Sequence, residues 1–195
     1  MRRLVCALVL VSLPARADWE KFADKEGVLV EWRKIDASRV REIRATGVVE
    51  QPLGKLVAAL RDLEHFPEFM PPTQAVEILS GAGDHRRIHV TIDPSWVQRR
   101  DYCLDVTWAE SPSYAESRWY QIGDGCPPAK KNVVRHTRTE GTWRLYALDE
   151  RRTRVEYQAI TDPGGSIPGW IVDRATAKQM RSMYQSLEKR ASTLP

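Results

Sequence analysis

The chain has 195 residues, of which 30 are Lys or Arg and 26 are Asp or Glu, for a formal net charge of +4. This length fits one globular domain. Three of the basic residues (Arg2, Arg3 and Arg16) lie among the first 17 residues, which contain no acid, so the remainder holds 30 − 3 = 27 basic against 26 acidic residues. A nearly neutral remainder argues against a nucleic-acid partner.

The first 17 residues have the layout of a secretory signal peptide. An arginine pair precedes an apolar run from Leu4 to Pro14, and Ala15-Arg16-Ala17 supplies the small residues that signal peptidase recognises. A membrane anchor is the alternative interpretation, but a spanning helix needs about 20 apolar residues, more than this run contains. We therefore predict a signal peptide over 1–17 and an exported domain over 18–195, periplasmic or secreted.

The first part of this domain is predicted to form a short helix, two strands and two more helices. Residues 18–25 begin with an aspartate that can cap a helix. Apolar and polar residues alternate over 28–33 and 42–49, which is the period of half-buried strands. Pro52 opens a run with leucines at helical spacing, and a second short helix is expected over 64–69.

Most of the following chain alternates apolar and polar residues between turns rich in Gly, Pro, Ser or Asp. Strands with this pattern are predicted near residues 74–80, 85–93, 96–109, 114–123, 134–148 and 152–160. From Pro168 to about Ala191 the apolar residues recur at helical spacing instead, which predicts one long helix. A curved antiparallel sheet around one long helix is an α+β fold of the helix-grip type.

Several short motifs occur in the order in which they are found in START (StAR-related lipid transfer) domains. Residues 162–168 (DPGGSIP) resemble the family's DPGG-x-[IL]-P entry to the C-terminal helix. Residues 25–33, 99–102 and 141–145 resemble other family segments, although Pro94-Ser95-Trp96-Val97 departs from the family's P-W-P. The resemblance spans nearly all of the predicted domain. It implies a hydrophobic tunnel between sheet and helix that holds one lipid or sterol-sized molecule.

The predicted ligand-binding residues come from three segments of this tunnel. One face of the strand near 96–109 is apolar and should point toward the helix. Methionine and small residues on the helix leave room and adapt to varied ligands. The predicted set is Trp96, Arg100, Tyr102, Leu104 and Trp108, with Val155 and Tyr157 on a later strand and Thr176, Met180 and Met183 on the helix. An ordinary core filled by the tryptophans is the alternative.

Arg100 lies among apolar neighbours on that strand face, where an unpaired charge is costly. Either it anchors the polar head or carboxylate of a ligand, or it reaches the rim of the fold or pairs with a buried acid. A β-bulge before Arg100 would turn it to the other face. The sequence leaves these interpretations open.

Gly164, Gly165 and Gly169 surround the entry to the long helix and give its backbone freedom. The START resemblance suggests that this helix and nearby loops open to release a ligand, so these glycines are a predicted gate. A tight turn with no gating role explains them equally well.

Cys103 and Cys126 remain after the predicted leader, and an oxidising compartment permits a disulfide between them. If 101–109 and 114–123 form a hairpin, Cys103 faces about residue 120. Cys126 then comes within the Cα distance of about 7 Å that a bridge requires only if its proline-rich loop folds back. A disulfide and a free loop thiol both stay open.

His85 and His89 are four residues apart on a predicted strand, about 13 Å, which is too far for one metal ion. We expect a solvated pair and predict neither a metal nor a cofactor. The sequence also contains no G-x-S-x-G elbow or phosphate-binding loop, so no catalytic residue is predicted.

These observations favour a carrier or sensor of a hydrophobic ligand, not an enzyme, acting as a monomer with transient membrane contact. The alternative is a cyclase- or hydrolase-like enzyme that uses Arg100 with a Tyr or Asp of the cavity on a hydrophobic substrate. A third interpretation, an interaction module with a filled core, holds if the fold contains no cavity.

Overall fold

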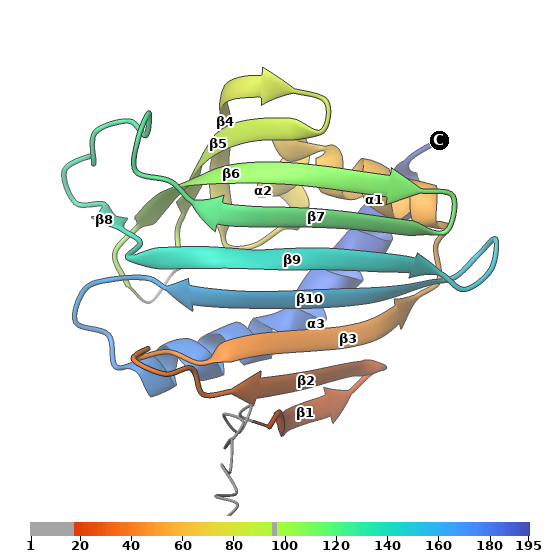
Figure 1. Ribbon diagram of the computed structural model, residues 1–195, viewed down its shortest axis with the longest axis horizontal. Coiled ribbons are helices and arrows are strands. Elements are labelled where there is room, and N and C mark those ends of the chain that lie inside the picture. The colour runs from red at the N-terminus through yellow and green to blue at the C-terminus, as the bar shows by residue number, and fades with distance from the viewer. Residues whose placement is uncertain (1–17, 95–96) are drawn as a thin grey trace, which may run out of the picture.

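The computed structural model describes residues 18–94 and 97–195. One face of a large sheet packs on the long helix α3 (Gly169–Thr193), which lies behind the sheet in Figure 1. The predicted signal peptide and Trp96 lie outside the described residues. Within the described ranges, no helix is both long and apolar enough to cross a membrane.

The sheet has ten strands in the order β1-β2-β3-β10-β9-β7-β6-β5-β4, with β8 beside β6. All pairs are antiparallel except β6 with β8. The strands are β1 (Glu20–Lys25), β2 (Val28–Arg33), β3 (Glu42–Val49), β4 (Thr73–Ala82), β5 (His85–Ile92), β6 (Arg100–Ser111), β7 (Tyr114–Gln121), β8 (Val134–Arg135), β9 (Arg138–Ala147) and β10 (Thr153–Asp162). The short helices between β3 and β4 are α1 (Leu53–Arg61), η1 (Leu63–His65) and α2 (Phe66–Phe69). The predicted helix-grip α+β class is confirmed.

The helix predicted over residues 18–25 is wrong, because this segment forms strand β1 and pairs with β2. The two strands meet in a turn at Glu26 and Gly27, which both have positive φ angles (54° and 76°). Two such residues match the right-handed twist of a hairpin. Phe22 also packs on Trp32 across the pair, with ring centroids 4.6 Å apart. The hairpin therefore prevails over the local capping signal.

The strand predicted over 134–148 is two strands in the structure. β8 runs parallel to β6, and β9 begins at Arg138 and pairs with β7 and β10. Two backbone hydrogen bonds hold the break: His136 N donates to Asp101 O (2.9 Å), and Thr137 N donates to Asp162 O (3.0 Å). This interruption brings His136 to the inner side of the sheet, where it matters for the site below.

The C-terminal half of α3 packs tightly on β3 and β10. The hydroxyl of Tyr184 donates to Ala45 O (2.8 Å) and Val155 O (3.0 Å). A Cβ at Gly47 would lie 3.1 Å from the Tyr184 ring, so this glycine makes room for the aromatic side chain. Gly47 therefore serves dense packing at this end of the fold.

A second apolar cluster is separate from this packed core. Ile88, Val90 and Leu104 form its buried centre on β5 and β6. The main core contains Leu145, Val155 and Leu187 among others, and belongs to the strands on the other side of β7 and to the helices. The inner face of one continuous sheet thus carries two hydrophobic clusters, and the space between them is the cavity described next.

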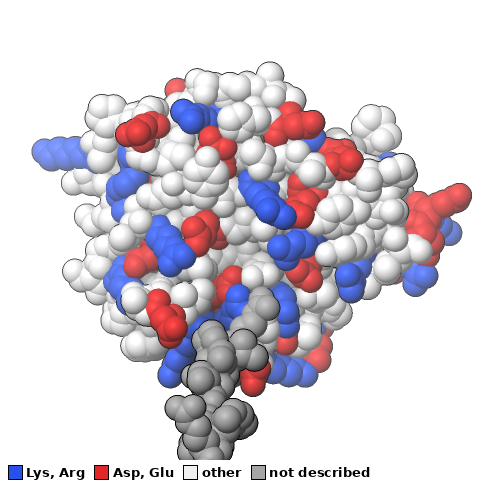
Figure 2. All heavy atoms as spheres, viewed as in Figure 1, with Lys and Arg blue, Asp and Glu red and all other residues white. Residues whose placement is uncertain are grey.

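The outer face of the sheet carries paired charges of both signs (Figure 2). Arg44 contacts Glu31 at 2.7 Å, and Arg144 contacts Glu156 at 2.9 Å. Positive and negative side chains are interspersed over this face, as on an ordinary solvated surface.

Candidate ligand-binding cavity

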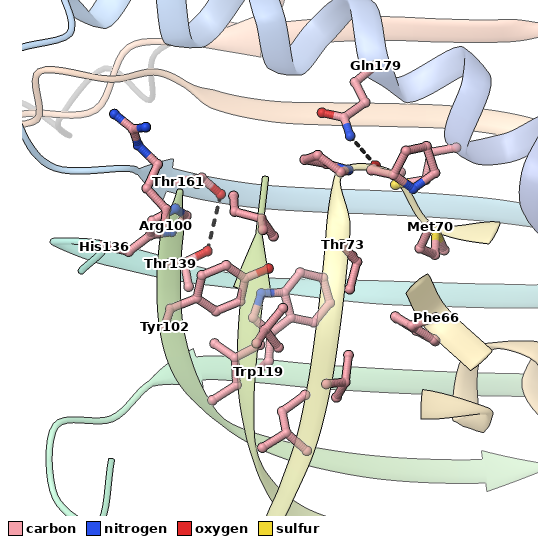
Figure 3. A pocket seen from close by; sticks show the side chains of 18 of the residues that line it. Phe66, Met70, Thr73, Arg100, Tyr102, Trp119, His136, Thr139, Thr161 and Gln179 are labelled. Atoms are coloured by element: carbon pink, nitrogen blue, oxygen red, sulfur yellow. Dashed lines mark hydrogen bonds between the residues drawn. The ribbon is translucent and has the colours of Figure 1, made fainter. Parts of the chain in front are cut away.

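A cavity of about 670 Å³ lies between the curved sheet and α3. Figure 3 shows side chains that reach it from the sheet, from α3 and from the short helices before β4. Its volume lies within the range of about 300–1,000 Å³ that is typical of small-molecule sites. The interior of the sheet is therefore under-filled by the protein's own side chains.

The walls are mainly apolar because the inward residues of β5 and β6 alternate in register. Ile88 pairs with Leu104, and Val90 pairs with Tyr102. Side chains from both clusters complete the walls: Leu60, Phe66, Met70, Val106, Trp108, Trp119, Trp143, Tyr157, Met180 and Met183. Such a lining favours a largely hydrophobic occupant.

Most of the predicted ligand-binding residues line this cavity. They are Arg100, Tyr102, Leu104, Trp108, Tyr157, Thr176, Met180 and Met183. Val155 does not line it, because its side chain is fully buried in the main core. Trp96 lies outside the described residues.

Trp119 is a lining residue that sequence reasoning missed. It stands opposite Gly141 on β9, where a Cβ would come within 2.6 Å of the indole ring. A glycine inside a strand marks a close approach of this kind, and Gly141 was the signal available in the sequence. His136, Thr139 and Thr161 were also missed, because the strand break that positions them has no clear sequence pattern.

Arg100 is the charged group at the polar end of the cavity (Figure 3). Its side chain is buried, with 4% of the residue's surface exposed, and one guanidinium nitrogen, Nη1, donates to Gln98 O. Nε has no hydrogen-bond partner, and no carboxylate of the described residues lies within 4 Å of the guanidinium. The undescribed residues contain no Asp or Glu. Of the sequence interpretations, pairing with a buried acid is therefore wrong.

His136 lies beside Arg100 and is equally buried, with 3% of its surface exposed. Its ring stacks on Tyr102 with centroids 4.6 Å apart, and neither ring nitrogen has a partner among the described residues. Burial and the nearby positive charge of Arg100 lower the pKa of His136 from 6.5 to about 4. Burial raises the pKa of Tyr102 to about 12. Both side chains are therefore neutral at pH 7.

Two hydroxyl groups complete this polar end. Thr139 Oγ1 and Thr161 Oγ1 are 3.2 Å apart on the neighbouring strands β9 and β10. Arg100 and His136 lie on the same side of the cavity as these hydroxyls (Figure 3). We call this group of four residues the polar cluster.

The other charged residues that line the cavity are either paired or partly exposed. Arg61 contacts Asp84 at 2.6 Å and also contacts Glu110. Asp93 accepts a hydrogen bond from Arg99 at 2.9 Å. Arg86 is partly exposed and pairs in register with Val106, six residues along β6 from Arg100. Arg100 is thus the buried cation of the lining that lacks a counter-ion.

On the opposite face of β6, Asp101 binds two basic side chains. It contacts His89 Nε2 at 3.0 Å and accepts from Arg135 Nε (2.7 Å) and Nη2 (2.8 Å). The prediction that His85 and His89 are a solvated pair is wrong for His89, which is buried, because Asp101 supplies its partner. Within the described residues, no three His, Cys, Asp or Glu side chains gather closely enough to hold a metal ion.

Cys103 and Cys126 form a disulfide, with Cα atoms 5.7 Å apart. The loop after β7 folds back along β6, and β8, which follows this loop, pairs with the start of β6. Arg135 Nη2 donates to Pro127 O (2.9 Å) and helps to hold this return. The register of the hairpin alone does not predict this return of the loop, so the sequence left the disulfide open.

Arg39 ties down the entry to α3. Its Nε donates to Asp162 Oδ2 (2.6 Å), and its Nη1 donates to Gly165 O (3.2 Å) and Ile167 O (3.0 Å). Gly164 and Gly165 both have φ angles of +69°, as a tight turn requires.

Gly169 serves a close approach at the same entry, because a Cβ there would lie 1.9 Å from Arg39 O. In this conformation the predicted gate is therefore a tight turn held by the hydrogen bonds of Arg39.

A largely apolar cavity between a curved antiparallel sheet and its C-terminal helix defines a helix-grip ligand-binding protein. Residues 49–188, more than half of the chain, match the family of polyketide cyclase / dehydrase and lipid transport proteins. The chain therefore belongs to this family, and its architecture is that of a START domain.

Two solved structures share this architecture, and one further protein is similar to this chain along nearly its whole length. A STAR-related lipid transfer protein from Xanthomonas axonopodis is 26% identical, with a TM-score of 0.80 over 90% of this chain and 99% of that chain. Human StAR-related lipid transfer protein 5 shares the fold at 19% identity, with a TM-score of 0.76 over 89% and 86% of the two chains. The uncharacterized Pseudomonas aeruginosa protein PA1579 is 24% identical over 97% of this chain and 98% of its own length.

An enzyme shares the fold more distantly. The Zhui aromatase/cyclase from Streptomyces sp. R1128 is 16% identical, with a TM-score of 0.59 over 78% of this chain and 93% of that chain. The fold alone therefore accommodates binding proteins and enzymes, and the choice between them depends on the site.

Proposed function

We propose that this protein binds one lipid or sterol-like molecule in its cavity and carries or presents it without changing it chemically. The observation that carries the proposal is the unfilled space of about 670 Å³ between the sheet and α3. Each ligand methylene removed from water contributes about 0.8 kcal/mol, so an alkyl chain alone gives strong retention. The similarity to a STAR-related lipid transfer protein supports the same conclusion.

Enzymatic conversion of a hydrophobic substrate is the second candidate, and the aromatase/cyclase with this fold is the reason to consider it. General acid–base catalysis works best when the pKa of the catalytic group lies near the working pH. The pKa of His136 is about 4 and that of Tyr102 is about 12, so neither group is poised near neutrality. The titration of the cavity residues therefore favours binding.

The entry to α3 is the proposed exit for the ligand. Pro163, Ile167, Val172 and Thr176 line the cavity on either side of this turn. If the Arg39 contacts to Asp162, Gly165 and Ile167 break, the turn and the start of the helix are free to move away from the sheet. We propose that this opening occurs at a membrane and that the protein acts as a monomer.

Export is part of the same proposal. It rests on the signal-peptide pattern of residues 1–17, and the disulfide supports it because such bonds persist in oxidising compartments. N-terminal sequencing of protein recovered from the periplasmic fraction is expected to begin at Asp18. Recovery of the full chain from the cytoplasm would contradict export.

A filled cavity provides the direct test of binding. Ala175 lines the cavity, and Ala175→Trp should occupy part of the space that a ligand needs. Lys178 is exposed on the same helix, and Lys178→Trp serves as the matched control. We expect the neutral fluorophore N-phenyl-1-naphthylamine to bind the wild type and Lys178→Trp with equal affinity, and Ala175→Trp at least about tenfold more weakly. Equal binding by all three proteins would place the fluorophore elsewhere and contradict the proposal.

A further inference from the structure

The polar cluster holds a buried positive charge without a negative one. Arg100 has no carboxylate within 4 Å among the described residues, and both Asp101 and Asp162 are bound to other basic side chains. Asp101 faces the other side of β6 and binds His89 and Arg135. Asp162 binds Arg39 and the backbone N of Gly164 (2.9 Å). No acid of the protein is therefore placed to neutralise Arg100.

An isolated buried charge is costly unless a partner of opposite sign is supplied. The groups around Arg100 are suited to receive one. His136 is neutral and so carries one N–H that can donate, and neither of its ring nitrogens is satisfied among the described residues. The hydroxyls of Thr139 and Thr161 lie nearby (Figure 3). A guanidinium supported by such donors is a good receptor for carboxylate or phosphate oxygens.

The apolar part of the cavity leads away from this cluster. Figure 3 shows Arg100, His136, Thr139 and Thr161 gathered on one side, with Phe66 and Met70 on the opposite side. The side chains drawn between them include Tyr102 and Trp119, which supply mostly apolar surface. The two ends of the cavity thus differ in chemistry, and an elongated ligand with one polar end fits in one direction only.

We propose that the ligand is an amphipath with an anionic head, a carboxylate or a phosphate monoester, which binds Arg100 and His136 while its alkyl chain extends toward Phe66 and Met70. This inference rests on the proposed function and specifies the ligand of the same site. Sterols and other uncharged lipids would leave Arg100 without a counter-ion and bind less tightly.

Competition against N-phenyl-1-naphthylamine tests this in the full-length mature protein. The competitors are hexadecanoate, hexadecyl phosphate and hexadecanol, which share one chain and differ in the head, each kept below the concentration at which it aggregates. A hydrogen bond to a charged group is worth enough that we expect at least one of the anions to bind about tenfold more tightly than hexadecanol. The stronger of the two anions identifies the head. Equal affinity of all three competitors would overturn the inference.

Arg100→Gln should remove this preference and leave the affinity for hexadecanol nearly unchanged. Arg87→Gln is the control, because Arg87 lies on the neighbouring strand β5, is about half exposed and binds Asp105 on the outer face. The control should keep the tenfold preference. An anion preference that persists in Arg100→Gln would also overturn the inference.

The two proposals fail separately in this experiment. Binding of the fluorophore and of hexadecanol without any anion preference retains a hydrophobic carrier and overturns only the anionic head. Failure of the wild type to bind the fluorophore or any competitor overturns the cavity as a ligand site, and the anionic head with it. The wild-type comparison stands even if Arg100→Gln does not fold.

Discussion

Some single residues of this protein determine how closely its elements pack, and others determine the chemistry of the cavity. Gly141 has no side chain, so Trp119 can come close to β9 and form part of the wall of the cavity. Arg100 and His136 place polar groups in that cavity without satisfying them. Packing at Gly141 therefore contributes to the stability of the fold, whereas Arg100 and His136 determine which ligands the cavity binds.

Gly141→Ala should destabilise the protein by about 1–3 kcal/mol, the usual cost of overpacking. Its Cβ would lie 2.3 Å from Gln158 O and 2.6 Å from the Trp119 ring, so the backbone must shift. Gly54 in α1 has open space around it, and Gly54→Ala should instead stabilise by about 0.5–1 kcal/mol. Urea unfolding measures both changes, and similar values for the two variants would argue against the packing of Trp119.

His136 makes stability depend on pH. Its folded pKa of about 4 lies below the ordinary value of 6.5, so the unfolded state binds a proton that the folded state does not accept. The neutral imidazole contributes fully to the free energy of unfolding above pH 6.5. This contribution, about 3 kcal/mol, is lost as the pH falls toward 4.

His136→Gln should flatten this part of the curve of unfolding free energy against pH. The control is His65→Gln, because the hydrogen bond to Asp62 raises the pKa of His65, which therefore adds stability at low pH. Removal of His65 should steepen the loss on acidification. A His136→Gln curve parallel to that of the wild type between pH 6.5 and 4 would refute the buried neutral imidazole.

At the level of elements, α3 has two attachments of different strength. Its C-terminal half is fixed to β3 and β10 by Tyr184. Its entry turn is held by Arg39, whose side chain is 39% exposed and therefore accessible to water. The helix is thus expected to open at its N-terminal end while its C-terminal half stays in place.

Tyr184→Phe should cost about 1–2 kcal/mol of unfolding free energy, because it leaves the carbonyls of Ala45 and Val155 without this donor in a buried place. Tyr120→Phe is the control, since Tyr120 is 52% exposed and should change stability little. Chemical denaturation followed by tryptophan fluorescence measures both, and an unaffected Tyr184→Phe protein would show that this attachment is not needed.

Arg39→Gln should accelerate ligand release several-fold, because it removes the ion pair with Asp162 and the bonds to the entry turn. Stopped-flow displacement of the bound fluorophore gives the rate. Arg152→Gln is the control, because it breaks an ion pair with Asp149 on the surface and none of the contacts to the entry turn. It should leave the release rate unchanged. Equal rates for Arg39→Gln and the wild type would exclude the entry turn as the exit.

At the scale of the whole molecule, the sequence predicted the helix-grip class because alternation and helical spacing report which faces are buried. It did not predict β1, where pairing with β2 prevails over the local capping signal. It also did not predict the break before β9, because β8 pairs with β6, a strand distant in the sequence. The same limit applies to the cavity. Arg100, Tyr102 and Met180 follow from their place on an inward face, whereas His136 and Thr161 reach the cavity only through the break and the end of β10.

Val155 shows why an inward face does not by itself define a ligand site. It lies one alternation from Tyr157 on β10, but its side chain is fully buried in the main core, whereas Tyr157 lines the cavity. The position along the strand relative to the packed half of the helix decides which inward residues line the cavity. That relation is tertiary, so periodicity in the sequence does not contain it.

Native mass spectrometry of the protein purified without delipidation shows whether a hydrophobic guest completes the interior. We expect a folded monomer heavier than the polypeptide by the mass of one lipid, which organic solvent releases intact. A folded protein that carries no such mass, and gains none after incubation with a lipid extract of its host, would contradict this expectation.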